Sequence, residues 1–231
     1  MAFPAIVGSQ ISSRSTNAQD DVVPLPASIA AGDLIIHLHS SDTSQTRTWP
    51  SPWAEIKDTA VSGNVSTIGV AYLIASGGET EVTVTKLSSE RHSSIAIRIS
   101  AASWHGTTPP EVSTGATGDD TTPDPDAVTA SWGSEDNLFI AVAAFDNSAG
   151  AGAITAFPTN YAGNNLQSPD ITSCGRNGIG TRELAAASDD PGTFTMSPTD
   201  QWWAGTIVVR PAGGAPAFSP PHNLMILGVG R

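Results

Sequence analysis

Apolar side chains alternate with polar or small ones in several short segments, and this two-residue period constrains the fold of the chain more than any other feature. Residues 34–39 read Leu-Ile-Ile-His-Leu-His, and residues 95–99 read Ile-Ala-Ile-Arg-Ile. Successive side chains of a strand point to opposite faces of its sheet, so such segments predict half-buried strands. Similar segments at 68–75, 81–85, 138–145 and 206–210 are separated by stretches rich in turn-forming residues. The pattern predicts an all-β protein built from antiparallel hairpins.

The predicted strands fall into two similar series. GDLIIHLHSSD at 32–42 aligns with DNLFIAVAAFD at 136–146, which lies 104 positions later. VTV at 82–84 aligns with FTM at 194–196, and IAIR at 95–98 with IVVR at 207–210, each 112 positions later. Between these blocks an aromatic-Pro-x-x-aromatic element occurs in both series, as WPSPW at 49–53 and FPTNY at 157–161. The larger second offset indicates an insertion after this element in the second copy.

A few strands from one copy leave an apolar sheet face uncovered, and two copies would most simply cover each other. We therefore expect an antiparallel two-sheet sandwich or jelly roll as a single domain over residues 1–212, with pseudo-repeats at about 4–102 and 111–212. After Arg210 the composition changes to Pro-Ala-Gly-Gly-Ala-Pro, which predicts a linker. Residues 213–231 are interpreted as this linker and an extended C-terminal arm.

The arm contains Phe218 and a run of four large apolar residues, Leu224, Met225, Ile226 and Leu227. Full burial of each such side chain contributes about 1.5–3 kcal/mol, so the run is expected to be docked rather than exposed. The nearby prolines and glycines favour an extended segment that adds to a sheet edge or lies in a groove. We expect these five residues to bind another subunit or another protein of an assembly. The alternative is that the arm folds back on its own sandwich.

The charge balance disfavours two classes of partner. The formal net charge of -12 repels the phosphates of nucleic acids and anionic lipid headgroups. The N-terminus lacks a basic region followed by an apolar stretch, and no apolar run is long enough to span a bilayer, so we expect synthesis in the cytoplasm. The single cysteine, Cys174, excludes an internal disulfide.

No motif of reaction chemistry occurs in the sequence, so we predict a non-enzymatic protein without a cofactor or a metal. Gly-x-Ser-x-Gly and His-Glu-x-x-His are absent, and the glycines at 175–180 lack the order of a nucleotide-binding loop and predict an ordinary loop instead. The acidic stretch at 118–126 lacks the spacing and closing Glu of a calcium loop and predicts a solvated loop, although calcium binding there stays open.

His37 and His39 are the closest approach to a metal motif. They lie two residues apart on a predicted strand and share a face, but a site needs further ligands, which His92 or His105 could supply only through contacts made by the fold. We predict that both histidines lie on a solvated or rim face.

Trp49 and Trp53 are the candidate glycan-binding residues, because aromatic faces stack on the apolar faces of sugar rings in shallow sites. The consecutive Trp202 and Trp203 point to opposite faces of a predicted strand, so at least one of them is expected in the core.

Four motifs resemble those of a family of tailed-bacteriophage virion proteins: GDLII at 32–36, WPSPW at 49–53, VAYLIA at 70–75 and SIAIR at 94–98. In that family a GDLL strand, a P-x-GW turn, a YYKVA-like strand and an AIRP-like closing strand recur. The second copy repeats the closing element as TIVVRP at 206–211, whereas the turn here reads Pro52-Trp53 without the glycine. The resemblance implies a jelly-roll-like sandwich in a head decoration, fibre or tail appendage, with no catalytic residues to carry over.

By this resemblance the chain is expected in the virion, bound to capsid or tail proteins and to copies of itself as a homo-oligomer. Two other function classes stay open. A carbohydrate-binding module would use Trp49 and Trp53 to bind a host-surface glycan. A glycan-degrading enzyme would need only two carboxylates held across a cleft.

Overall fold

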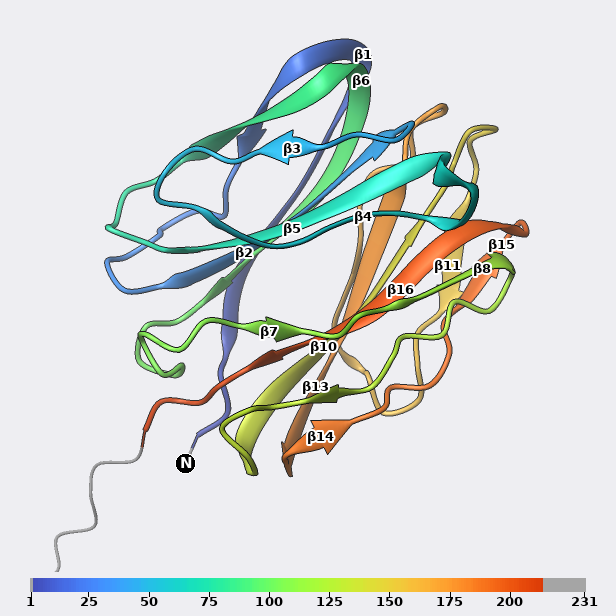
Figure 1. Ribbon diagram of the computed structural model, residues 1–231. Coiled ribbons are helices and arrows are strands. Elements are labelled where there is room, and N and C mark those ends of the chain that lie inside the picture. Colours follow the sequence, from blue (N-terminus) through green and yellow to red (C-terminus); the bar gives the residue numbers. More distant parts are fainter. Residues whose placement is uncertain (1, 214–231) are drawn as a thin grey trace, which may run out of the picture.

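Two antiparallel β-sheets face each other in the computed structural model, which describes residues 2–213 (Figure 1). The first sheet has the strand order β1-β6-β2-β5-β4, with β3 paired to β6. The second has the order β12-β13-β10-β16-β7, with β8 paired to β16. This confirms the predicted all-β sandwich. No helix within residues 2–213 is long and apolar enough to cross a membrane.

The strands of the first sheet are β1 (Ile6–Pro24), β2 (Leu34–Asp42), β3 (Arg47–Thr48), β4 (Ala54–Ala60), β5 (Ser66–Ile74) and β6 (Glu81–Ile99). Those of the second are β7 (Glu111–Val112), β8 (Ala116–Asp120), β10 (Glu135–Phe145), β12 (Gly163–Gln167), β13 (Arg176–Ala186) and β16 (Asp200–Val209). Two small ribbons pair β9 (Val128–Thr129) with β14 (Ser188–Asp189) and β11 (Ala153–Ala156) with β15 (Thr195–Ser197), and a 3-10 turn η1 (Ser62–Asn64) precedes β5.

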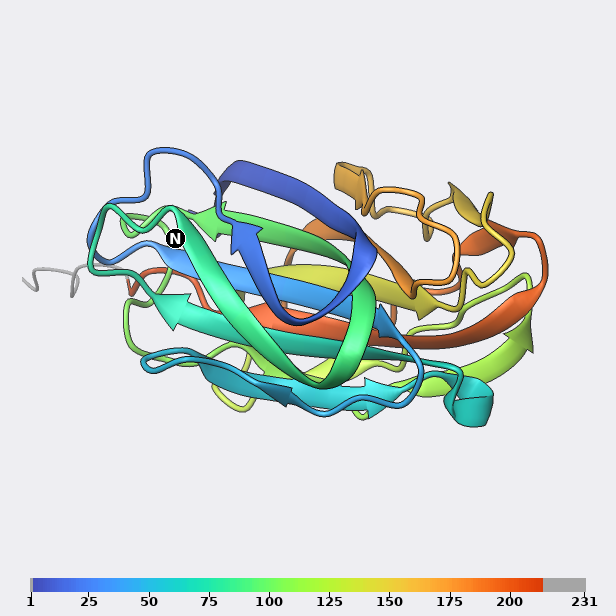
Figure 2. The ribbon, with the colours of Figure 1, turned by 90° about the horizontal axis from the view of Figure 1, so that it is seen from above.

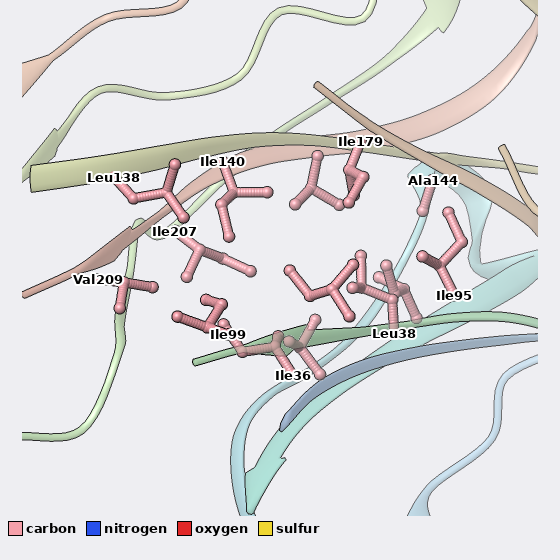
Figure 3. Packing of buried hydrophobic residues seen from close by; sticks show 14 of the residues in the cluster. Ile36, Leu38, Ile95, Ile99, Leu138, Ile140, Ala144, Ile179, Ile207 and Val209 are labelled. Carbon is pink, nitrogen blue, oxygen red and sulfur yellow. The ribbon is translucent and has the colours of Figure 1, made fainter. Parts of the chain in front are cut away.

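The main core lies between the sheets and is built from the apolar positions that alternate in the sequence. Leu34, Ile36 and Leu38 of β2 belong to the same buried cluster as Leu138, Ile140 and Val142 of β10. Figure 3 shows Ile36, Leu38, Ile95 and Ile99 of the first sheet facing Leu138, Ile140, Ile207 and Val209 of the second. Each sheet therefore covers the apolar face of the other.

The two sheets have corresponding strand orders. Reading β7 and β8 against β1, β10 against β2, β12 against β4, β13 against β5 and β16 against β6 maps the first order onto the second. This is the correspondence that an internal repeat produces. The repeat itself stays a prediction from the sequence.

A long, bent ribbon of β1 and β6 covers the outer face of the first sheet. The sequence predicted two separate strands at 81–85 and 95–99, but these segments are the two ends of β6. Residues 6–14 pair with 92–99, and residues 20–24 pair with 81–85, with register shifts between the two stretches. At the shifts the ribbon folds back, so that Val23, Val82 and Val84 pack against Ile35 on the outer face (Figure 2).

The glycines at 175–180 were wrongly predicted to form a loop. All of these residues except Gly175 belong to β13. The prediction failed because these glycines make room for neighbours: a Cβ at Gly180 would lie 3.1 Å from Asn165 Oδ1 and 3.2 Å from the Tyr161 carbonyl oxygen. The sequence carries no local sign of this close approach.

Because the core is shared, we expect the two sheets to unfold as one cooperative unit. A fragment of residues 1–105 would expose the inner face of the first sheet, including Leu34, Ile36 and Ile97, and should be insoluble or unfolded. Its NMR spectrum is the measurement, with the full chain as the control. A well-dispersed spectrum from the fragment would contradict a single folding unit.

Candidate functional site

A cluster of buried polar side chains lies under the folded-back ribbon, on the outer face of the first sheet. His37 and His39 of β2 are both 0% exposed, so the prediction of a solvated or rim face was wrong. The bend in β1 and β6 covers this face, and no local sequence pattern indicates this bend. The structure also brings His92 next to His39, with ring centroids 5.1 Å apart, whereas His105 lies elsewhere.

The Asp21 carboxylate is the centre of this cluster, which we call the Asp21 network. Asp21 is fully buried on the folded-back part of β1. Its Oδ2 lies 2.6 Å from Lys86 Nζ and 3.0 Å from His39 Nε2, and its Oδ1 lies 3.0 Å from His92 Nδ1. Arg14 also donates a hydrogen bond to Oδ1. One carboxylate thus binds groups from both halves of the bent ribbon and from β2.

Arg47 of β3 extends the network toward β4 and β5. Its Nε donates to His39 Nδ1 at 3.0 Å, and its Nη1 pairs with Asp58 at 2.7 Å. Its Nη2 donates to the main-chain oxygen of Thr67 at 2.9 Å. Gly69 leaves room for this side chain, because a Cβ there would lie 2.5 Å from Arg47 Cδ. The guanidinium is therefore held on several sides by oxygen and nitrogen acceptors.

These hydrogen bonds decide whether the cluster suits a metal. Asp21, His39 and His92 offer ligand atoms within 4.8 Å of one another, which is close enough for a metal site. Arg47 is always protonated, so His39 Nδ1 must accept its hydrogen bond, and the ring proton is then on Nε2, which donates to Asp21. His39 has no lone pair free for a metal, and the Lys86 ammonium already lies beside the carboxylate. The arrangement is that of an ionic hydrogen-bond network.

Burial sets the protonation states in the network. Desolvation, followed by the nearby charges of His92 and Arg47, lowers the pKa of His37 to about 3. Burial also lowers the pKa of His39 well below its usual range, despite its hydrogen bond to Asp21. Burial alone would raise the pKa of Asp21, but the hydrogen bonds and charges of His39 and His92 outweigh it and lower that pKa. At neutral pH the network holds an ionised carboxylate and a neutral His39, and the neighbouring His37, which makes no hydrogen bond to the network, is also neutral.

The second sheet covers its outer face in a different way. Ala141 and Ala143 stand where the sequence alignment places His37 and His39, and they belong to an apolar cluster. Polar contacts also occur at the edge of this apolar cluster. The Tyr161 hydroxyl donates to Asp189 at 2.6 Å, and Asp189 pairs with Arg182 at 2.8 Å. The ionised network is thus a feature of the first sheet.

Trp49 and Trp53, the candidate glycan-binding residues, lie side by side at the edge of the same outer face. Their rings stack with centroids 5.8 Å apart, and both rings contact His37. Both tryptophans are half-buried against the outer apolar cluster. Trp202 and Trp203 lie on opposite faces, as predicted, and both are buried.

A surface hollow of about 390 Å³ borders Trp53. It lies between the 50–53 turn, the end of β5 and the start of β6. A second hollow, of about 590 Å³, lies between the start of β1 and the 160–164 segment. Neither hollow is lined by a member of the Asp21 network.

The remaining predicted site residues are dispersed. The acidic stretch at 118–126 was predicted to be a loop, but its first three residues belong to β8 and pair with β16, where Asp120 accepts a hydrogen bond from the Trp202 indole at 3.1 Å. Burial raises the pKa of the Cys174 thiol to about 12, which keeps it in the unreactive thiol form. The predicted partner-binding residues Phe218, Leu224, Met225, Ile226 and Leu227 lie outside the described residues.

Comparisons with known proteins identified no relative of this chain. No family model matches the chain, and no curated protein and no solved structure was found to be similar to it. The class that the chain itself defines is an all-β, two-sheet antiparallel sandwich.

We expect Asp21 to be the most sensitive charged position of the first sheet. Asp21→Ala would leave Lys86 buried without its counter-charge, which typically costs about 3–5 kcal/mol of unfolding free energy. In the double variant Asp21→Leu with Lys86→Met both charges are absent, and the loss should be smaller. Urea unfolding of the parent chain, Asp21→Ala and the double variant measures the three free energies of unfolding. A loss below about 1 kcal/mol for Asp21→Ala would show that the network contributes little to stability.

We expect the buried His37 and His39 to make the protein less stable in acid. The folded-state pKa of His37 is depressed to about 3 from 6.5, so below pH 6.5 the unfolded chain binds a proton that the folded chain does not. This contribution is absent above pH 6.5 and destabilises increasingly as the pH falls, by about 2 kcal/mol at pH 5. Urea unfolding from pH 7 to pH 5 should show a smaller decline for His37→Leu, while His39 maintains part of the slope. Ser131→Ala, outside the network and without a titratable side chain, is the control and should keep the parent slope.

Proposed function

We propose that this protein is a non-enzymatic structural subunit of a tailed-bacteriophage virion, of the decoration, fibre or tail-appendage kind. It would bind other capsid or tail proteins and further copies of itself. The proposal rests on the family resemblance of its motifs and on where those motifs lie in the sandwich.

The observation that carries the proposal is that the motifs recur in matching places of the two sheets. Both aromatic-Pro elements form a turn closed by the equivalent backbone hydrogen bond, although the backbone conformations of the two turns differ: Trp53 N donates to the Pro50 carbonyl at 2.9 Å and Tyr161 N to the Pro158 carbonyl at 3.0 Å. An arginine near the end of each closing strand pairs with a carboxylate; Arg98 is the last residue but one of β6, and Arg210 directly follows β16. Arg98 pairs with Asp33 at 2.9 Å, and Arg210 with Glu135 at 2.7 Å. These motifs serve to hold a rigid sandwich together, as a structural subunit requires.

An exposed sheet edge supports binding to other subunits. β1 is the edge strand of the first sheet over 19 residues and pairs, within the described chain, with β6 alone. It exposes large apolar side chains, with Val7 47%, Ile11 44% and Val22 53% exposed. Residues 6–14, before the bend, form an unpaired edge that is a template for adding a strand from another chain.

We expect the C-terminal arm to supply the contacts between subunits. Replacing Leu224, Met225, Ile226 and Leu227 by Ser in the full chain removes the proposed anchors without shortening the protein. The variant should be monomeric by analytical ultracentrifugation and keep the parent melting temperature, whereas the parent chain should form concentration-dependent oligomers.

Leu87→Ser is the matched control, because Leu87 is 68% exposed and lies outside the arm. A parent chain that stays monomeric would contradict assembly through the arm. A large loss of melting temperature in the four-residue variant would show that the arm completes its own sandwich.

A further inference from the structure

The hollow beside Trp53 has the composition of a small binding site. We call it the Trp53 pocket and define it by Pro52, Trp53, Ile74, Glu79, Glu81 and Thr83. Its volume of about 390 Å³ is at the lower end of the range for sites that hold small molecules. Apolar and polar side chains both line it, as in sites that bind amphipathic ligands.

The Trp53 ring is held in a fixed orientation. Trp49 stacks against it at a centroid distance of 5.8 Å, and the edge-on His37 ring is 6.0 Å away. Trp53 lines the pocket and Trp49 does not, so the pocket is bordered by a part of Trp53 that its neighbour leaves uncovered. A rigid aromatic surface binds with little loss of side-chain entropy.

The corresponding turn of the second sheet buries its aromatic residue. Tyr161 follows Pro158 with the same backbone hydrogen bond as Trp53, yet it is 1% exposed. Phe194 and Met196, from the segment that includes β15, belong to the cluster that covers it. In the first sheet the aligned residues Val82 and Val84 belong to the cluster against which Trp53 packs, yet Trp53 is only half-buried, and Ile74 is 40% exposed. Apolar surface of Trp53 and Ile74 thus stays open beside the pocket, whereas the corresponding aromatic residue of the second sheet is sealed, and a contiguous open apolar surface is a candidate binding surface.

The polar groups of the pocket select the class of ligand. Glu79 is fixed by Ser76 N, Ser76 Oγ and Gly77 N, at 2.6, 2.7 and 3.0 Å, so its carboxylate is a rigid part of the wall. Glu81 and Thr83 are exposed at the rim and can exchange hydrogen bonds with ligand hydroxyls. Two carboxylates disfavour an anionic ligand. A quaternary ammonium ligand is favoured by a cage of several aromatic rings, and a single ring borders this pocket.

We propose that the Trp53 pocket binds one residue of a neutral pyranose oligosaccharide. The apolar face of the sugar ring would lie on Trp53, and its hydroxyls would donate to Glu81 and exchange hydrogen bonds with Thr83. This proposal is independent of the arm and of its role in assembly, so either can fail without the other.

The test is titration of the full chain with neutral hexasaccharides of α-1,4-glucose, β-1,4-glucose and β-1,4-N-acetylglucosamine. Sialyllactose and choline serve as the anionic and cationic probes. The indole N–H signal of Trp53, assigned with Trp53→Phe, reports binding in NMR spectra. We expect at least one neutral hexasaccharide to shift this signal saturably with a Kd below 10 mM, and neither charged probe to do so.

Variants locate the site. Trp53→Ala should weaken binding at least tenfold, measured by saturation-transfer NMR on the sugar. Glu81→Lys and Thr83→Lys should do the same while keeping the melting temperature, because both residues are exposed; they keep the test valid if Trp53→Ala fails to fold. Leu87→Ser, outside the pocket, should bind as the parent chain does. The proposal is overturned if no neutral hexasaccharide binds, if binding survives Glu81→Lys and Thr83→Lys, or if choline binds instead.

Discussion

The buried carboxylate of Asp21 holds the outer layer of the first sheet in place. It binds Arg14 and His92 from the flat part of the β1–β6 ribbon, and Lys86 from the part that folds back. Without such a link, a two-stranded ribbon bent through two register shifts would have few hydrogen bonds to define the bend. The same carboxylate binds His39 of β2, so the bend is also fixed against the sheet below it. The folded-back ribbon lies on the same outer face as His37, whose ring also contacts Trp49 and Trp53.

The two sheets show two solutions to one problem, which is to cover the outer face of a strand that is buried on both sides. β10 uses Ala141 and Ala143 under apolar neighbours, whereas β2 uses His37 and His39 under an ionic network. A buried ionic network costs desolvation, and apolar residues of similar size are often at least as stable. What a network adds is specificity of register, because a slip of one residue in β1 or β6 would separate Asp21 from Lys86. This reasoning explains why the irregular ribbon lies over the polar face.

The sequence predicted the elements whose signal is local. Alternation in residues 34–39 and 138–145 correctly placed two central strands, because the period of two is a property of each strand alone. It wrongly predicted them to be half-buried, since both faces of each strand are covered. The bend, and with it the burial of His37 and His39, depends on a contact between Asp21 and His92 that no local pattern shows. A weaker signal was present: Lys86 continues the alternation of Val82 and Val84, and Asp21 that of Val23. Both charges therefore point to the side that their apolar neighbours bury, and charges in such positions are normally paired.

The charged groups inside this protein have bonding partners, whereas several groups at its surface are exposed to solvent. Asp21 and Arg47 are surrounded by partners inside the sandwich, so these charges are engaged in structure and have little freedom to act on a ligand. At the surface, by contrast, the Trp53 turn and the β1 edge expose aromatic, apolar and main-chain groups to solvent. A group contributes to binding when the free energy of its new contacts exceeds the cost of ordering and desolvating it. Exposed groups on a rigid support meet this condition, because they lose little conformational entropy. The Trp53 turn and the β1 edge are therefore the surfaces suited to binding a partner. The buried histidines are not, although they are the more conspicuous feature of the sequence.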